Sequence, residues 1–144
     1  NEVVGSSVMY FRTRIPRNVT LSYNGLAIAP VQAMINGALF EWVVENLLKN
    51  SLDALQGQGE IDVRISDDLE WVYIDVKDTG KGIPKSNFKR IFEPGFTTKT
   101  RGWGLGLSLS RRIIEEYHKG RIYVVDSEPG RGTTIRIALK RLYA

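Results

Sequence analysis

The chain has 144 residues, of which 42% are hydrophobic and 25% are charged, and its formal net charge is +4. This composition is ordinary for a globular protein, and the length predicts a single domain over residues 1–144. The weak, dispersed positive charge does not support a nucleic-acid partner, the absence of cysteine excludes disulfides and thiolate metal sites, and no apolar run is long enough to cross a membrane.

The first 36 residues carry the fewest structural signals. Residues 19–23 alternate between apolar and polar types as a β-strand does, and Asn24-Gly25 follows as a turn signal. Pro30 suits the first turn of a short helix that reaches Asn36. The chain starts without Met and lacks the pattern of a signal peptide, and we expect it to be a piece of a longer protein.

The clearest helix is predicted over residues 39–55, followed by a β-hairpin. Strands with alternating apolar residues are predicted at 61–65 and 72–76, and the acidic turn Asp67-Asp68 lies between them. The helical periodicity comes from Leu39, Val43, Leu47, Leu48, Leu52 and Leu55, with Gly57 and Gly59 ending the helix.

The second half of the chain predicts one more helix and two more strands. A second long helix is expected over residues 105–117, with Leu105, Leu109, Ile113 and Tyr117 on one stripe. Strands are expected at 122–125 and 133–139. This order of elements predicts an α/β (α+β) two-layer sandwich, with a mixed, mainly antiparallel sheet and helices on one face.

Two asparagines on the predicted long helix are candidates for binding phosphate or a metal ion. Asn46 and Asn50 are four residues apart, so their side chains lie on one helix face. Amides there can contact phosphate or ligate Mg²⁺, which accepts one or two protein oxygens beside phosphate oxygens. The alternative is that both decorate an exposed helix. Glu45, Lys49 and Asp53 alternate in sign beside them and indicate an exposed ion-pair ladder.

The segment from Asp78 to Ile83 follows the second hairpin strand and contains Gly80 and Gly82. A carboxylate at this place can accept a hydrogen bond from an exocyclic amine such as that of adenine. The glycines would let backbone approach a planar ring closely. A simple Asp-x-Gly turn explains the same residues and is the better explanation when the segment is taken alone.

Two further glycine-rich stretches occupy residues 102–108 and 130–134. Glycines before a helix leave backbone N–H groups free to face anionic oxygens, and Lys99 and Arg101 lie just upstream. The first stretch matches neither a Walker A loop nor the dinucleotide fingerprint, so a flexible loop is its alternative. The second, 130–134, is equally explained as a hairpin turn.

The order of these four signals resembles the catalytic ATP-binding domain of sensor histidine kinases. This family belongs to a wider group with gyrase-type, heat-shock chaperone and mismatch-repair ATPases, so the resemblance implies a Bergerat-type ATP-binding fold. It covers the chain from about residue 39 to its end. Residues 45–51 look like the N box, 78–82 the first glycine box, 88–96 the F box, 102–106 the second glycine box and 130–134 the last one.

The resemblance implies a role for each matching residue in binding Mg-ATP. Asp78 bonds the adenine amino group, Asn50 ligates Mg²⁺, and Asn46 lies near the phosphates. Phe92 and Phe96 anchor a mobile ATP lid. The nucleotide-binding set implied is Asn46, Asn50, Asp78, Gly80, Gly82, Ile83, Phe92, Lys99, Arg101, Gly102, Gly104, Leu105, Gly106, Leu107, Thr133 and Thr134; of these, Asn46 and Asn50 are also the catalytic candidates.

The amide at Asn46 bears on the reaction type. Hydrolysing relatives carry a Glu there to activate water, and an amide cannot act as that general base, so transfer to a protein histidine is favoured over hydrolysis. Many histidine kinases have Lys or Arg where this chain has Asp53, so Lys99 or Arg101 would supply the charge at the phosphates instead.

The resemblance also predicts the partners. We expect His118 to make a local structural contact, with the phosphoacceptor histidine on a separate helical dimerisation domain. A response regulator would act downstream, the full-length protein would be a homodimer, and this domain would lie in the cytoplasm without membrane contact. A degenerate nucleotide-binding interaction module, a Ser/Thr protein kinase of the anti-sigma-factor type and a hydrolysing ATPase are the alternatives.

Overall fold

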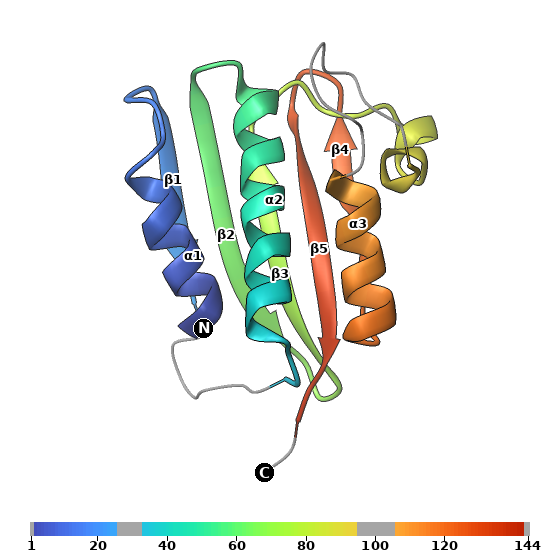
Figure 1. The fold of residues 1–144 in the computed structure, drawn as a ribbon. Helices are drawn as coiled ribbons and strands as arrows, with labels where there is room; N and C mark the ends of the chain where they lie inside the picture. Colours follow the sequence, from blue (N-terminus) through green and yellow to red (C-terminus); the bar gives the residue numbers. More distant parts are fainter. Residues whose placement is uncertain (1, 26–32, 95–105, 143–144) are drawn as a thin grey trace.

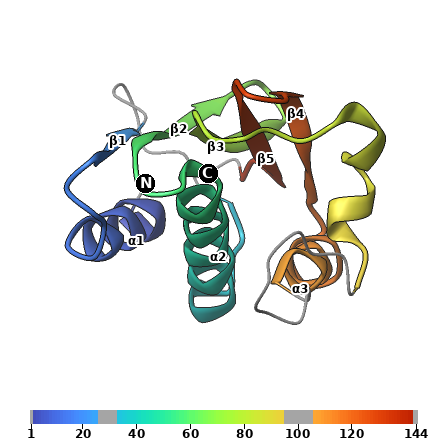
Figure 2. The same cartoon turned by 90° about the horizontal axis from the view of Figure 1, so that it is seen from above.

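A computed structural model describes residues 2–25, 33–94 and 106–142. It has two layers, a five-stranded sheet and a set of helices that all cover one of its faces (Figures 1 and 2). The elements are α1 (Glu2–Arg12), β1 (Val19–Asn24), α2 (Gly37–Leu55), β2 (Gly59–Asp67), β3 (Trp71–Asp78), the 3-10 turns η1 (Lys85–Asn87) and η2 (Arg90–Phe92), α3 (Gly106–Arg112), the π-helical turn η3 (Ile113–Tyr117), β4 (Arg121–Glu128) and β5 (Gly132–Lys140).

The sheet has the strand order β1-β2-β3-β5-β4. The pair β1 and β2 is parallel, and the other three pairs are antiparallel. The predicted mixed, mainly antiparallel sheet with helices on one face is therefore confirmed. The hairpin of β2 and β3 is also confirmed, with Ile65 opposite Ile74 in its register. Among the described residues, no helix is long and apolar enough to cross a membrane.

Helix α2 crosses the middle of the helical layer (Figure 1) and begins two residues before the predicted start. Asn36 caps it, because the Asn36 side-chain oxygen accepts a hydrogen bond from the Leu39 backbone N–H at 3.2 Å. Gln56 ends it in the left-handed conformation, with φ of 54°. Its buried stripe consists of Phe40, Val43, Val44, Leu47, Leu48, Ser51 and Leu55.

Two N-terminal features differ from the sequence expectations. Helix α1 lies where no element was predicted. Its buried apolar stripe is short, consisting of Val4, Val8 and Phe11, and Gly5 in its first half is a weak helix former. The short helix expected from Pro30 to Asn36 is not present over residues 33–36, which form neither helix nor strand, and Asn36 is the N-cap of α2. Pro30 itself lies outside the described residues.

The second predicted helix is rotated relative to the expected stripe. Leu109 and Tyr117 were expected on the buried side but are 42% and 64% exposed. Ile113 is buried as expected, and the other buried positions are Ser110 and Ile114. A π-helical turn begins at Ile113, and its extra residue per turn shifts the register of everything after it.

The N-cap of α2 gives a stability prediction. Asn36→Ala removes the side-chain acceptor for the Leu39 N–H and is expected to lower the free energy of unfolding by about 1 kcal/mol. Asn36→Asp keeps an acceptor, adds a negative charge at the helix N-terminus and should match or exceed the wild type. Urea unfolding of the three proteins measures this. Equal stability of the Ala and Asp variants would contradict the cap.

Candidate functional site

The centre of the candidate site is the carboxyl group of Asp78, at the end of β3. The residues of β3 in the same alternating phase as Asp78 are buried against the helices, so the Asp78 side chain lies on the helix-covered face. Asp78 is only 5% exposed. Its carboxyl oxygen Oδ1 accepts a hydrogen bond from the Gly80 backbone N–H at 2.9 Å, and the Ser51 side chain and the Thr133 backbone also donate to this group.

Burial raises the pKa of the Asp78 carboxyl group above its ordinary value, and this is the largest effect on it. The three hydrogen bonds from Gly80, Ser51 and Thr133 oppose the shift because they favour the charged form. The chain thus buries an acidic group and surrounds it with donors taken from a loop, from α2 and from β5. Such a group is a candidate for ligand recognition.

The first glycine-rich segment packs directly on α2 and on the β4–β5 turn. The α-carbon of Gly80 lies so close to Ala54 that a Cβ would stand 2.5 Å from the Ala54 carbonyl oxygen. The Lys81 N–H donates to that same carbonyl at 3.1 Å. Gly82, with φ of 77°, lies against the backbone of Glu128. Packing within the chain therefore requires both glycines.

The two asparagines lie on one face of α2, and both are half-buried. Asn46 Nδ2 donates to Ser110 Oγ at 3.0 Å, and the Ser110 hydroxyl donates to the Gly106 carbonyl at 2.8 Å. Asn46 also lines a small hollow of about 50 Å³ on the surface of α2, together with Trp42, Glu45 and Lys49.

The structure describes some of the remaining predicted nucleotide-binding residues and leaves others outside its described ranges. Leu107 is half-buried and packs on the core from the first turn of α3, and Phe92 is buried in η2. Ile83 donates its N–H to Ser127 Oγ at 2.7 Å. The predicted site residues Lys99, Arg101, Gly102, Gly104 and Leu105, and the lid residue Phe96, lie outside the described residues.

Thr133 and Thr134 lie on opposite faces of the sheet, as neighbours in a strand do. Thr133 is opposite Asp78 in the register and is buried, and its hydroxyl is 2.8 Å from Ser127 Oγ. Thr134 is opposite Lys77 on the helix-free face. The structure therefore brings Thr133, and not Thr134, to the face that carries the Asp78 side chain.

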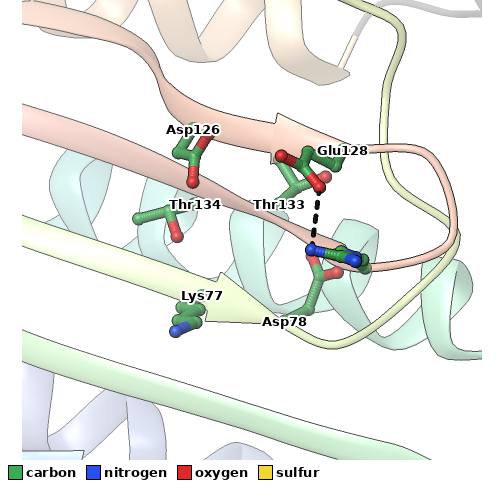
Figure 3. Close-up of a pocket in the computed structure, with 8 residues that line it drawn as sticks. Lys77, Asp78, Asp126, Glu128, Thr133 and Thr134 are labelled. Atoms are coloured by element: carbon green, nitrogen blue, oxygen red, sulfur yellow. Dashed lines mark ion pairs between the residues drawn. The ribbon is translucent and has the colours of Figure 1, made fainter.

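A hollow of about 200 Å³ lies at the same end of the sheet. Figure 3 shows that side chains of β3, β4 and β5 line it. Lys77 and Thr134, which lie on the helix-free face, are among them, so this hollow opens toward the helix-free face of the sheet. Its full lining is Lys77, Asp78, Asp126, Glu128, Arg131, Gly132, Thr133 and Thr134, with an ion pair of 3.4 Å between Arg131 and Glu128.

His118 makes the local structural contact that was expected of it. Its Nδ1 lies 2.9 Å from the Ile113 carbonyl, and its Nε2 accepts the Asn36 backbone N–H at 3.0 Å. Because a carbonyl only accepts and an N–H only donates, the ring carries its proton on Nδ1. The ring also packs on Phe40, with 5.7 Å between centroids. His118 therefore joins the end of η3 to the start of α2.

Three serines contribute to the site and were not among the predicted residues. Ser51 bonds to Asp78, Ser110 bonds to Asn46, and Ser127 joins Ile83 to Thr133. For Ser51 and Ser110, the sequence contains one signal that could have identified them as site residues. Each occupies a core-facing helical position, where a small hydroxyl replaces the apolar side chain that the pattern otherwise has.

Comparisons with known proteins show the family and the fold of the chain. Residues 36–142 match the family described as "Histidine kinase-, DNA gyrase B-, and HSP90-like ATPase". Sporulation kinase A of Bacillus subtilis (strain 168) is 43% identical over 96 residues, which are 67% of this chain but 16% of that protein. The chain thus spans about a sixth of the length of this curated relative.

Solved structures show the same fold. The catalytic domain of histidine kinase ThkA superposes with a TM-score of 0.85 at 28% identity, covering 97% of this chain and 92% of that one. Histidine kinase ThkA in complex with response regulator protein TrrA superposes with a TM-score of 0.83 at 26% identity, covering 99% of this chain and 40% of that one.

The buried Asp78 carboxyl group predicts how stability depends on pH. Between its ordinary pKa of 3.8 and its raised value, the folded state keeps a proton that the unfolded state has lost. The contribution of Asp78 to the free energy of unfolding therefore falls as pH rises through this window and stays low above it. Asp78→Asn should remain folded and gain stability relative to the wild type as pH rises.

Urea unfolding at a series of pH values that extends both below and above 3.8 measures this difference. Asp68 provides a control of opposite sign, because its hydrogen bonds from Tyr73, Glu70 and Trp71 lower its pKa. The contribution of Asp68 is present above pH 3.8 and is lost as pH falls through its lowered pKa. If the difference between Asp78→Asn and the wild type did not change with pH, the raised pKa of Asp78 would be contradicted.

Proposed function

We propose that this chain, which belongs to the family of histidine kinase-, DNA gyrase B- and HSP90-like ATPases, binds Mg-ATP and delivers the γ-phosphoryl group to a histidine of a separate helical dimerisation domain. The chain is a catalytic ATPase domain of the histidine kinase type, and this type implies ATP binding. The phosphotransfer of the whole protein is our proposal, because the chain spans only part of its relatives.

The observation that carries the proposal is the partly saturated carboxyl group of Asp78. An ionised carboxylate offers about four acceptor sites. Donors from Gly80, Ser51 and Thr133 take three of them. One acceptor site is therefore left for a further donor, and an exocyclic amine such as that of adenine supplies one. The fixed donors also hold the carboxylate in place, so it binds without reorganising.

The residues present suit Mg²⁺ better than a metal held mainly by protein. Among the described residues, no group of three His, Cys, Asp or Glu side chains could hold a metal ion. Mg²⁺ needs only one or two protein oxygens, and the Asn50 amide oxygen, half-buried on α2, is of the kind it prefers. When bound with ATP, Mg²⁺ neutralises charge on the phosphate oxygens.

Asn46 supports transfer to a protein over hydrolysis. Its amide is engaged by Ser110 and has no basic atom that could take a proton from water. The residue can orient phosphates or ordered water but cannot activate a nucleophile. In our proposal, Lys99 and Arg101 supply positive charge at the phosphates. The acidic side chain of Asp53 on α2 cannot supply it.

The partners in this proposal are a helical dimerisation domain that carries the phosphoacceptor and a response regulator that receives the phosphoryl group. The structural neighbour ThkA, which was solved in complex with response regulator protein TrrA, supports the second partner. The proposal also places the domain in the cytoplasm and the full-length protein in a homodimer.

The nucleotide site is tested by calorimetric titration of ATP and GTP, each with and without Mg²⁺. Asp78→Asn should weaken ATP binding by about 10-fold to 100-fold, the equivalent of one charged hydrogen bond of roughly 1.5–3 kcal/mol, and should abolish the preference for ATP over GTP. Asn50→Ala should weaken binding only when Mg²⁺ is present.

Asp126→Asn is the matched control, because Asp126 is exposed on β4, which is separated from β3 by β5. It removes the same charge near the same end of the sheet and should leave ATP binding unchanged. Unchanged ATP affinity in Asp78→Asn would contradict the adenine assignment. An Asn50→Ala effect of equal size without Mg²⁺ would contradict the metal assignment.

Phosphotransfer is tested by incubating the full-length protein with ATP labelled at the γ-phosphorus. We expect acid-labile label on the dimerisation domain, because phosphohistidine is hydrolysed in acid. Label on His118 would contradict the proposal, and so would acid-stable label, steady release of inorganic phosphate without labelled protein, or tight ATP binding with no label at all. The last three outcomes correspond to a Ser/Thr kinase, an ATPase and an inactive module.

A further inference from the structure

The side chain of Asn46 on α2 is joined to helix α3 by a short hydrogen-bonded relay. Asn46 Nδ2 and Ser110 Oγ are 3.0 Å apart, and Ser110 Oγ and the Gly106 carbonyl are 2.8 Å apart. Ser110 is fully buried, with 0% exposure. The three groups lie within the helical layer, where α2 and α3 face each other (Figure 2).

The direction of these hydrogen bonds follows from proton counting. A serine hydroxyl has one proton, and the Gly106 carbonyl can only accept, so that proton lies between Ser110 and Gly106. The lone pairs of Ser110 Oγ must then accept from Asn46. If the Asn46 amide were flipped, its oxygen would face those lone pairs and both groups would lose a hydrogen bond. Ser110 therefore selects one of the two orientations of the amide.

The selected orientation places the Asn46 oxygen against a glycine. Asn46 Oδ1 lies 2.7 Å from the point where a Cβ on Gly106 would stand. A side chain at that residue would therefore displace the amide. Gly106 is the first residue of α3 and belongs to the glycine-rich stretch of residues 102–108. The relay thus links the amide on α2 to the point where that stretch enters its helix.

We propose that Ser110 is a positioning residue of the kinase reaction, which holds the Asn46 amide in one orientation and ties it to the first turn of α3. The proposal rests on the proposed function, in which Asn46 lies near the phosphates. Ser110 does not touch the nucleotide in this proposal. It acts through Asn46, as hydrogen-bond partners behind a binding group commonly do.

The position of Ser110 predicts an effect on rate more than on affinity. Asp78 supplies the adenine contact and lies at the other end of the site, on β3 and beside the C-terminal half of α2. Loss of the Ser110 hydroxyl leaves that contact intact but lets the Asn46 amide rotate. A group that orients phosphates loses catalytic effect when its geometry loosens.

Ser110→Ala in the full-length protein is therefore expected to lower kcat for histidine phosphorylation about 10-fold, with the KM for ATP changed less than threefold. Ser7→Ala is the matched control. Ser7 is also a helical serine with 0% exposure, and among the described residues its Oγ has no hydrogen-bond partner. It lies on α1 and should leave both constants unchanged. Thermal unfolding of both variants separates a loss of folding from a loss of rate.

A double-mutant cycle with Asn46→Ala tests whether Ser110 acts through Asn46. We expect Ser110→Ala to have no further effect on kcat once Asn46 is replaced. If Asn46→Ala itself leaves kcat unchanged, the proposed role of Asn46 fails. If Asn46→Ala lowers kcat but Ser110→Ala does not, or if the two effects add, the positioning role of Ser110 fails while the proposed function stands.

A measurement on the nucleotide-free chain gives an independent readout. The Asn46 side-chain NH₂ should exchange its hydrogens slowly in the wild type and in Ser7→Ala, because Ser110 accepts one of them. In Ser110→Ala its exchange should be at least several-fold faster while the backbone amides of α2 stay protected. Equal side-chain exchange in all three proteins would overturn the proposal.

Discussion

The burial of the Asp78 carboxyl group is the constraint on which the rest of the site depends. An ionisable group at 5% exposure is tolerated only where donors surround it. Those donors come from Gly80 in the following loop, Ser51 on α2 and Thr133 on β5. To meet at one carboxyl group, the loop must fold back on α2 and β5 must pair beside β3. The group therefore fixes three separate segments of the chain in place.

Helix α2 serves both as the centre of the core and as one wall of the site. Its apolar stripe, which includes Val43, Val44 and Leu47, is fully buried against the sheet. Asn46 and Asn50 lie just beside that stripe, half-buried, so the packing of the core sets their position. Polar groups held by a rigid, buried helix keep their geometry better than groups on loops. Fold stability and site geometry are therefore linked through one element.

Packing within the chain gives Gly80 and Gly82 a role that their motif did not suggest. Gly80 and Gly82 were interpreted as a place where backbone approaches a planar ring, yet each lies against the backbone of α2 or of the β4–β5 turn. Gly132, with φ of 106°, lies against the Asp78 carbonyl in the same way. Close approach of backbone to backbone is what these glycines permit. They bring the segments together so that the carboxyl group and its donors meet.

The sequence by itself determined the main helices and strands after residue 36 and the order in which the candidate site residues follow one another. Apolar periodicity is a local property, so α2, the hairpin and the last two strands could be predicted. The same pattern placed Asn46 and Asn50 on one face of a helix and Asp78 at the end of a strand. Only the tertiary structure decided which face of α3 is buried, which partners Ser51, Ser110 and Ser127 have, and that α1 covers the sheet. Those depend on contacts between residues far apart in the chain, which a local pattern does not encode.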